Sequence, residues 1–395
     1  MTKMARTPNT QNGFRAEQSR RQLIGRMAMA GFSAPVIASI VHDMAFAQDA
    51  TPLPEDILRE LGKNPALIPR GTTNFETPLE LVESLLTPNE LFFIRSNGPI
   101  SLDIAAEDWS LTVSGLVDRE LELSLADIQG MESRTITAFL ECSGNARSRF
   151  DPQAEGSQWG NGAIGNAEWT GVSLIDVLDM AGVQMGAVDL VSQGADFSEM
   201  QRGLPLEVAG DPDVMLVWEM NGEPLPAPHG GPVRLLVPGW GGIASTKWIV
   251  GVEVIDRPFD GHFNTESYVI INEDGTILRP VREVPVYSVI TSPAPGEALA
   301  TGEQAVAGFA WSGYAGIARV DVSIDGGDWQ EAEIVEEAGP LSWVRFTLPW
   351  NAESGEHTLR SRATDQIALT QPVETVWNAK GYLMNAILDV PVTVS

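Results

Sequence analysis

Residues 135–150 read Thr-Ile-Thr-Ala-Phe-Leu-Glu-Cys-Ser-Gly-Asn-Ala-Arg-Ser-Arg-Phe. The β-branched and apolar residues of 135–141 predict a short β-strand. This strand runs directly into Cys142, the single cysteine of the chain, and the Ser-Gly-Asn that follows predicts a turn. Functional side chains are commonly carried by loops that a rigid scaffold holds in place. We therefore expect Cys142 to lie at a functional site.

Two arginines, Arg147 and Arg149, follow the cysteine closely. Nearby cations favour the thiolate, which is the form that attacks as a nucleophile or binds a metal. A nucleophilic hydrolase would need a base, for which His229 is the candidate, but no Asp or Asn partner for this histidine stands out. A metal bound by one thiolate would need its other ligands from elsewhere, for instance from an organic cofactor. The alternative to both is a small buried apolar residue.

A single cysteine excludes several kinds of site. An internal disulfide, a four-thiolate zinc or iron–sulfur site and covalent haem attachment through Cys-x-x-Cys-His all need further thiols. The four histidines, His42, His229, His262 and His357, are well separated and give little support to a multi-histidine metal site.

The composition is that of an acidic globular protein. The chain has 395 residues, enough for two or three domains, and 43% of them are hydrophobic, which excludes a wholly disordered protein. Only 25 basic residues face 53 acidic ones, giving a net charge of −28. Nucleic acid is therefore not an expected partner, because no excess of cations exists to displace counterions from phosphates. Such acidity suits a basic protein partner and is also common in proteins from saline habitats.

The first 47 residues predict an export signal. Arg20 and Arg21 precede an apolar stretch over 27–41, and Ala45-Phe46-Ala47 offers small residues for cleavage near Ala47. Paired arginines are typical of twin-arginine signals, which carry folded proteins, often with a cofactor already inserted. The apolar stretch is shorter than the roughly 20 residues that span a membrane, so no membrane anchor is expected. We predict a signal peptide over 1–47 and a periplasmic protein.

Residues 48–284 form the first predicted domain, an α+β fold in which short β-type runs alternate with helical pieces. A short amphipathic helix is expected near 78–86. Ser124 and Ser173 are suitable N-caps for two further helices, and Gly182 would end the second. Apolar and β-branched residues predict strands at 111–117, 135–141, 233–237 and 248–255.

Residues 285–395 form the second predicted domain, which has little helix. Asp325-Gly326-Gly327-Asp328 predicts a hairpin turn, because glycine readily takes the positive φ that tight turns need. Strands at regular spacing are expected at 306–311, 317–324, 329–335, 343–348 and 357–363. This pattern predicts a β-sandwich of immunoglobulin type.

The cysteine loop also resembles that of a known family. Glu141-Cys142-Ser143-Gly144-Asn145, together with Arg147, is similar to the molybdenum-ligating loop of the sulfite oxidase family. Further ordered stretches resemble motifs of the same family, at 87–95, 229–234 and 247–248. The resemblance continues through Tyr268 to the C-terminal strands. It implies a sulfite-oxidase-type molybdopterin domain followed by an immunoglobulin-like β-sandwich dimerisation domain, and hence a homodimer.

The resemblance implies roles for individual residues. Cys142 would be the protein ligand of molybdenum. The residues that would bind the molybdenum–molybdopterin cofactor are Phe93, Arg95, Asn97, Cys142, Asp196, His229, Arg234, Ser245, Thr246 and Lys247. The catalytic residues around the substrate would be Cys142, Arg95, Arg147, Trp159, Tyr268 and Arg345. Guanidinium groups suit a small oxyanion because they are planar and permanently charged.

The implied reaction is the two-electron oxidation of sulfite, or a related small sulfur oxyanion, to sulfate. Too few residues precede the family motifs for a haem domain, so no haem is expected in this chain and a separate c-type cytochrome would accept the electrons. Two alternatives stay open. One is a sulfane dehydrogenase subunit of the periplasmic sulfur-oxidising multienzyme system, and the other is a non-catalytic secreted β-sandwich protein.

Overall fold

The computed structural model describes residues 53–395, of which Leu58–Ser395 belong to one compact unit. The expected export signal, 1–47, lies outside the described residues. Within the described part, no helix is long and apolar enough to cross a membrane. The described chain begins with α3 (Pro54–Glu60) and a two-stranded sheet of β1 (Ile68–Pro69) and β2 (Phe75–Glu76).

The cysteine strand belongs to an antiparallel five-stranded sheet in the order β10-β9-β6-β5, in which β11 also pairs with β9. Its strands are β5 (Arg134–Glu141), β6 (Ile164–Ser173), β9 (Met215–Met220), β10 (Glu223–Pro224) and β11 (Arg234–Leu236). β5 pairs with β6 along its whole length, from Arg134 to Glu141. This ladder determines where Cys142 leaves the sheet.

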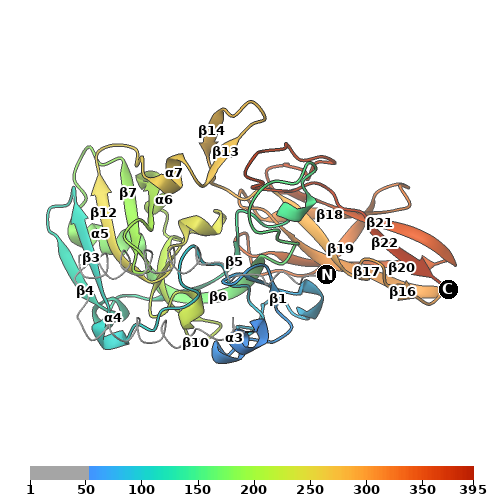
Figure 1. Cartoon of the computed structure of the whole chain (residues 1–395), viewed down its shortest axis with the longest axis horizontal. Coiled ribbons are helices and arrows are strands. Elements are labelled where there is room, and N and C mark those ends of the chain that lie inside the picture. Colours follow the sequence, from blue (N-terminus) through green and yellow to red (C-terminus); the bar gives the residue numbers. More distant parts are fainter. Residues whose placement is uncertain (1–52) are drawn as a thin grey trace, which may run out of the picture. The chain divides into compact units, whose positions relative to one another are not determined.

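A second five-stranded sheet lies in the same part of the molecule, in the order β4-β3-β12-β7-β8 (Figure 1). Its strands are β3 (Ser110–Gly115), β4 (Leu121–Ser124), β7 (Asp189–Gly194), β8 (Gln201–Pro205) and β12 (Ile249–Ile255). β3 and β12 are parallel, and the other neighbours are antiparallel. Leu111, Leu235 and Val252, from both sheets, share one buried core.

The short helices lie between these strands. α4 (Leu125–Gln129) begins at Ser124, whose hydroxyl accepts the Asp127 N–H while the Asp127 carboxylate accepts the Ser124 N–H. α5 (Leu174–Ala181) ends at Gly182, as expected, but the Ser173 hydroxyl donates to the Pro212 carbonyl instead of capping the helix. The expected helix at 78–86 is wrong, because only the 3-10 turn η1 (Leu79–Leu81) forms there. The remaining α-helices of residues 53–395 are α6 (Leu206–Ala209) and α7 (His262–Thr265).

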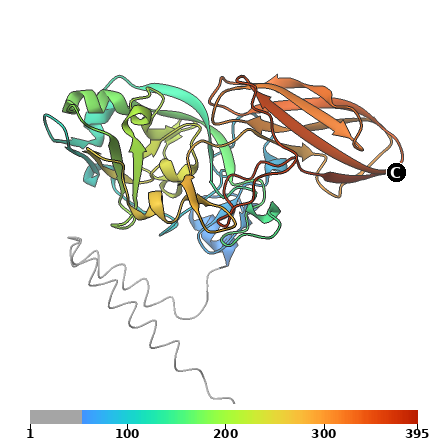
Figure 2. The same ribbon diagram turned by 90° about the horizontal axis from the view of Figure 1, so that it is seen from above.

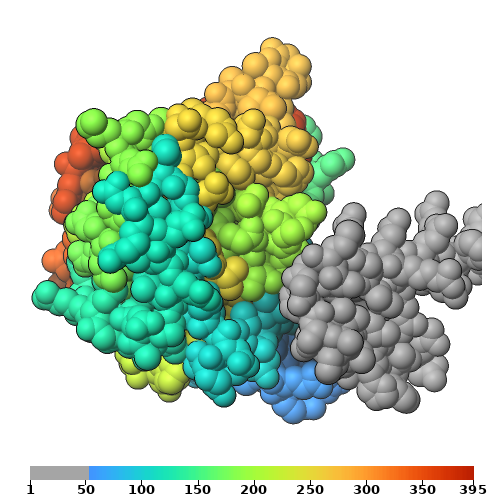
Figure 3. All heavy atoms as spheres, turned by 90° about the vertical axis from the view of Figure 1, so that its left-hand side faces the viewer, coloured from blue at the N-terminus to red at the C-terminus, as the bar shows by residue number. Residues whose placement is uncertain are grey.

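A hairpin of β13 (Val269–Ile271) and β14 (Ile277–Pro280) follows the second sheet. It projects from the first domain in Figure 1, and Figure 3 shows it rising from the edge of the face that looks away from the C-terminal strands. The backbone N–H of Ala379, far along the chain, donates to the Ile271 carbonyl at 2.9 Å. The hairpin begins directly after Tyr268 and therefore brings the segment next to this tyrosine into contact with a C-terminal loop.

The C-terminal part is one eight-stranded sheet in the order β15-β17-β20-β19-β18-β21-β22-β16 (Figure 2). Its strands are β15 (Tyr287–Ser292), β16 (Ala298–Leu299), β17 (Gly302–Trp311), β18 (Ile317–Ile324), β19 (Gln330–Glu336), β20 (Val344–Ala352), β21 (Gly355–Asp365) and β22 (Val390–Val394). Ser288 on β15 donates to Ser361 on β21 at 2.9 Å, although these strands are not neighbours in the sheet. The sheet therefore curls over a buried core into the expected β-sandwich.

Candidate active site

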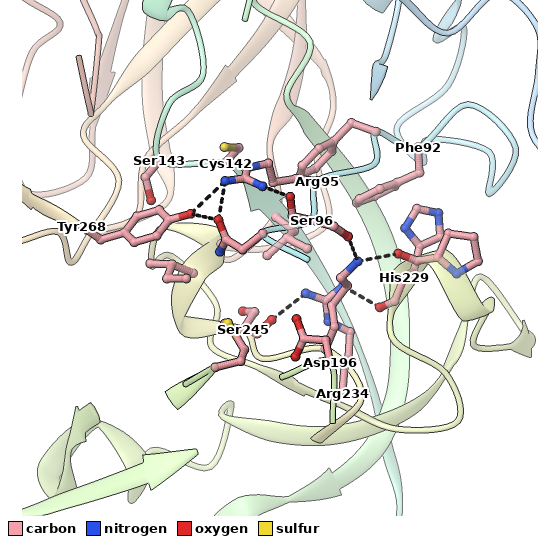
Figure 4. A pocket seen from close by; sticks show the side chains of 18 residues that line it. Phe92, Arg95, Ser96, Cys142, Ser143, Asp196, His229, Arg234, Ser245 and Tyr268 are labelled. Atoms are coloured by element: carbon pink, nitrogen blue, oxygen red, sulfur yellow. Dashed lines mark hydrogen bonds between the residues drawn. The ribbon is translucent and has the colours of Figure 1, made fainter. Parts of the chain in front are cut away.

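A cavity at the end of β5 brings together most of the residues that the sequence analysis singled out (Figure 4). Those that line it are Phe93, Arg95, Asn97, Cys142, Asp196, His229, Arg234, Ser245, Lys247 and Tyr268. They come from loops that follow β2, β5 and β7, and from the segment between β10 and β13. The cavity therefore lies where ends of both five-stranded sheets meet.

The Cys142 loop is held by a buried hydrogen-bond network. The Cys142 N–H donates to the Ala163 carbonyl at 2.8 Å, and the Asn145 side chain accepts the Ala163 N–H at 2.9 Å. Glu141 accepts hydrogen bonds from Asn145 Nδ2 at 2.7 Å and from Trp311 Nε1, on β17, at 2.9 Å. These hydrogen bonds fix both sides of the loop, so the thiol that follows Glu141 has a defined position.

The thiol is suited to a metal that brings its own ligands. Cys142 is unpaired and only 8% exposed, yet it lines the cavity. In the part of the chain that the structure describes, no group of three or more His, Cys, Asp or Glu side chains could hold a metal. A metal on Cys142 would therefore take its remaining ligands from outside the protein, as the sequence analysis required.

Buried cations line the side of the cavity farther from Cys142. Arg234 donates to the carbonyls of His229 and Ser245 at 2.8 and 2.9 Å. Lys247 Nζ donates to Ser96 Oγ at 2.6 Å and to the Pro228 carbonyl at 3.0 Å. Burial lowers the pKa of Arg234 to about 9 and the pKa of Lys247 well below its ordinary value. Neutral oxygens orient both groups, and a bound anion such as a phosphate would favour their charged forms.

Asp196 is the one carboxylate among the described residues that line this cavity. Its Oδ1 atom is buried without a hydrogen-bond partner. Burial raises the pKa of this carboxyl to about 6. An unpartnered acceptor of this kind costs free energy unless a ligand donates to it. Asp196 is therefore placed to accept a hydrogen bond from a ligand that carries N–H groups.

Near the thiol, Arg95, Asn97 and Tyr268 form a connected network (Figure 4). Arg95 Nη2 donates to Tyr268 Oη at 3.2 Å and to Asn97 Oδ1 at 2.5 Å. Tyr268 Oη in turn donates to Asn97 Oδ1 at 3.1 Å. The phenol and the guanidinium are thus oriented by one amide, and among the described residues no carboxylate forms a salt bridge with this arginine.

A second cavity, of about 340 Å³, adjoins the first and shares Arg95, Cys142 and Tyr268 with it. Arg147 lines this outer cavity, with Glu155, Gly156, Ser157, Lys380 and Tyr382. Arg147 donates to the carbonyls of Lys380 and Gly381 at 3.0 and 3.2 Å, and to the Ser157 carbonyl at 3.0 Å. Here too, neutral oxygens orient the cation.

Three of the predicted residues line neither cavity. Trp159 is fully buried behind Phe93, with ring centroids 6.5 Å apart. The Thr246 hydroxyl forms a hydrogen bond with Ser192 Oγ, at 2.7 Å. Arg345 lies on β20 and pairs with Glu336 at 2.7 Å. Its neighbours Val344 and Phe346 are buried in the β-sandwich, so the alternation of the strand directs Arg345 to the opposite face.

Three residues at or beside the cavities were not predicted from the sequence: Lys63, Lys380 and Tyr382. Lys63 contacts His229, and the other two residues reach the outer cavity from the C-terminal domain. The scarcity of lysine in the sequence could have indicated that the few lysines lie at the functional site. The chain has only four lysines, and of these Lys63, Lys247 and Lys380 lie at or beside the two cavities.

Comparison with known proteins agrees with this geometry. Residues 97–263 match the oxidoreductase molybdopterin binding domain, and residues 279–395 match the Mo-co oxidoreductase dimerisation domain. The sulfite oxidase of Arabidopsis thaliana is 32% identical over 372 residues, which cover 84% of this chain and 94% of the plant protein. This chain belongs to the sulfite oxidase family.

Two further relatives mark the extent of the match within the sulfite oxidase family. The mitochondrial sulfite oxidase of Rattus norvegicus is 35% identical over 342 residues, and the match covers 79% of this chain but 62% of the rat protein. The solved structure of the sulfane dehydrogenase SoxCD from Paracoccus pantotrophus has a TM-score of 0.75 and 32% identity, covering 87% of this chain and 91% of that chain. Both domains are therefore shared with proteins of this family.

The residues of the inner cavity fit the molybdenum–molybdopterin cofactor of the family. Cys142 would supply the thiolate ligand, which suits a metal of high oxidation state bound by further sulfurs. Arg234 and Lys247 would hold the cofactor phosphate, and the free Oδ1 of Asp196 would accept an N–H of the pterin. The fit thus rests on one thiol, two buried basic groups oriented by neutral oxygens and one unpartnered carboxylate oxygen.

Proposed function

We propose that this protein oxidises sulfite to sulfate. The observation that carries the proposal is the convergence of Arg95, Arg147 and Lys380 on one cavity beside Cys142. The two arginines are oriented by carbonyl, amide and phenol oxygens, so their charge is available to a small dianion. In a protein of net charge −28, such a local cluster of cations is needed to bind an anionic substrate.

In the overall reaction, sulfite and water give sulfate, two protons and two electrons. When bound, the molybdenum centre supplies the oxygen-transfer and electron-accepting chemistry. Arg95 and Arg147 would bind the oxygens of sulfite and orient its sulfur toward the Cys142 side of the cavity. Tyr268, which hydrogen-bonds with Arg95 and Asn97, is placed to hold or pass a proton at its phenol oxygen.

The test uses the full-length protein, purified from a host with intact pterin synthesis. We expect about one molybdenum per chain and sulfite-dependent reduction of ferricyanide. Arg147→Gln should raise KM for sulfite steeply, because it removes a cation from the cavity and leaves a neutral polar side chain. A molybdenum-loaded protein that leaves sulfite unchanged would contradict the proposal.

A sulfane dehydrogenase subunit is the second candidate. Two observations favour it: the likeness to SoxCD, and an outer cavity of about 340 Å³, which is larger than a sulfite ion. Efficient turnover of free sulfite without any partner protein supports sulfite oxidation. Turnover only of a sulfane carried by a partner protein supports the second candidate.

We further propose that a separate c-type cytochrome accepts the electrons. The excess of 53 acidic over 25 basic residues suits a basic cytochrome, whose association should slow as salt rises. Stopped-flow reduction of a basic cytochrome c at 10 and 300 mM salt tests this. A rate that is the same at both salt concentrations would remove the electrostatic part of the proposal.

Export and assembly complete the proposal. Residues 1–47 would direct twin-arginine export to the periplasm, and residues 285–395 would form a homodimer, as the matched dimerisation domain favours. N-terminal sequencing of the protein from a periplasmic fraction should begin near Gln48. Light scattering of the purified protein should give twice the mass of one mature chain, and a monomer mass would contradict the dimer.

A further inference from the structure

Tyr382 contacts two side chains of the outer cavity at once. Its ring stacks on that of Tyr268, with centroids 5.3 Å apart and an interplanar angle of 16°. The guanidinium carbon of Arg147 lies 5.0 Å from the centroid of the same Tyr382 ring. One aromatic side chain from the C-terminal domain therefore restrains both a cation and a phenol of the proposed substrate site.

The loop that carries Tyr382 is closely fitted to the cysteine loop. Asn378, which is 2% exposed, closes it by accepting the Tyr382 N–H at 3.0 Å and donating to the Tyr382 carbonyl at 2.9 Å. The Leu383 N–H donates to the Ser143 carbonyl at 2.9 Å, one residue beyond Cys142. The position of Tyr382 relative to the thiol is therefore set by direct hydrogen bonds.

Gly381 shows how little space separates this loop from Arg147. Its φ of +59° is unfavourable for other residues, and a Cβ there would lie 2.7 Å from Ala154 Cβ and 2.8 Å from Arg147 Cγ. The glycine lets the backbone approach the stem of Arg147, while the carbonyls of Lys380 and Gly381 accept its Nε–H. The backbone carbonyls of this loop and the Tyr382 ring thus restrain the same guanidinium group through separate contacts.

We propose that Tyr382 is a positioning residue that sets the affinity of the cavity for the tetrahedral oxyanion. The ring limits the movement of Arg147 and Tyr268 without adding a negative charge, so the guanidinium is ordered before the anion binds and stays fully cationic. The inference rests on the proposed function, since it concerns the same cavity. Its effect is on oxyanion binding, whereas the redox chemistry belongs to the cofactor held by Cys142.

The experiment compares Tyr382→Leu, Tyr382→Phe and the control Tyr314→Leu in the molybdenum-loaded, full-length enzyme. Tyr314 is an exposed tyrosine of the same domain that lines neither cavity. Calorimetry gives the Kd for sulfate, and steady-state kinetics gives KM and kcat for sulfite. We expect Tyr382→Leu to raise Kd and KM about tenfold, equivalent to about 1.4 kcal/mol, with kcat changed less than about twofold. Tyr382→Phe and Tyr314→Leu should stay within about twofold of the wild type.

Several outcomes would overturn the inference. Unchanged Kd and KM in Tyr382→Leu would show that the ring does not contribute to oxyanion affinity. Equal increases of Kd in the Phe and Leu variants would assign the effect to the hydroxyl. In an Arg147→Gln background, the effect of Tyr382→Leu should shrink to about threefold; a full tenfold effect there would mean that Tyr382 does not act through Arg147. Tyr382→Met replaces the leucine variant if circular dichroism shows that the latter is unfolded.

Failure of the proposed function has a different signature. A wild-type enzyme that binds sulfate but does not oxidise sulfite would contradict the proposed function. The dissociation constants for sulfate would still decide the role of Tyr382.

Discussion

Lys63 Nζ lies 2.8 Å from His229 Nε2 in the protein interior, although the two residues are 166 positions apart. Burial lowers the pKa of Lys63 to about 7, and it lowers the pKa of His229 well below the ordinary value. In a neutral imidazole one ring nitrogen donates and the other accepts, so the Lys63 contact restrains the orientation of the His229 ring whichever tautomer is present. A segment before the matched molybdopterin domain therefore orients a histidine that lines the inner cavity.

Lys63→Met is expected to weaken cofactor retention. The variant keeps the side-chain length but removes the amino group that contacts His229, and loss of such supporting contacts commonly costs about 10–100-fold in affinity for the group that is held. Molybdenum and pterin per chain, measured after extended dialysis, should fall at least twofold. Arg119→Met, which removes a cation from an exposed position, is the control. Equal cofactor content in both variants would separate Lys63 from cofactor binding.

Cys142→Ser should abolish sulfite turnover while the fold is kept. Serine has nearly the same size, but its oxygen is a hard ligand with a high pKa and does not replace a soft thiolate. We expect activity to fall at least a hundredfold and the midpoint of thermal unfolding to shift by a few degrees at most. X-ray absorption at the molybdenum edge should show one sulfur ligand fewer. Wild-type activity would reject Cys142 as the ligand.

Lys380→Met and Arg345→Met remove one positive charge each from the same domain, with different expected results. Lys380 lines the outer cavity, so its loss should raise KM for sulfite about tenfold, in line with a lost charge-assisted hydrogen bond. Arg345 pairs with Glu336 and lines neither cavity, so its loss should leave KM unchanged. Equal effects of the two variants would contradict this arrangement.

The His357–Asp325 pair predicts a pH dependence of stability. His357 Nδ1 lies 2.7 Å from Asp325 Oδ2, and this hydrogen bond raises the pKa of His357 above its ordinary value. The pair therefore stabilises the fold fully below about pH 6.5, and this stabilisation is lost as pH rises through the raised pKa. The difference in unfolding free energy between wild type and His357→Gln should be larger at pH 5.5 than at pH 9. Because Asp325 is exposed, we expect less than about 1 kcal/mol, and an equal difference at both pH values would refute the coupling.

Patterns that lie within a few residues predicted the local structure well. The strand expected at 317–324 is β18, and the turn expected at 325–328 follows it, with Asp325 and Gly326 at φ of 54° and 69°. The helix expected at 78–86 did not form, because Leu79 and Val82 pack among the aromatic side chains of the C-terminal strands. Packing against distant residues there outweighed a weak helical periodicity.

By itself, the sequence determined the strand that ends at Cys142, the β-sandwich after residue 285 and the chemistry that one thiol among cations permits. These conclusions depend on neighbouring residues and on side-chain type, which the sequence states directly. Only the tertiary structure decided that Lys380 and not Arg345 reaches the outer cavity, and that Tyr382 packs on Arg147. That outcome depends on contacts such as the hydrogen bond from the Leu383 N–H to the Ser143 carbonyl, which join residues 240 positions apart and leave no periodicity in the chain.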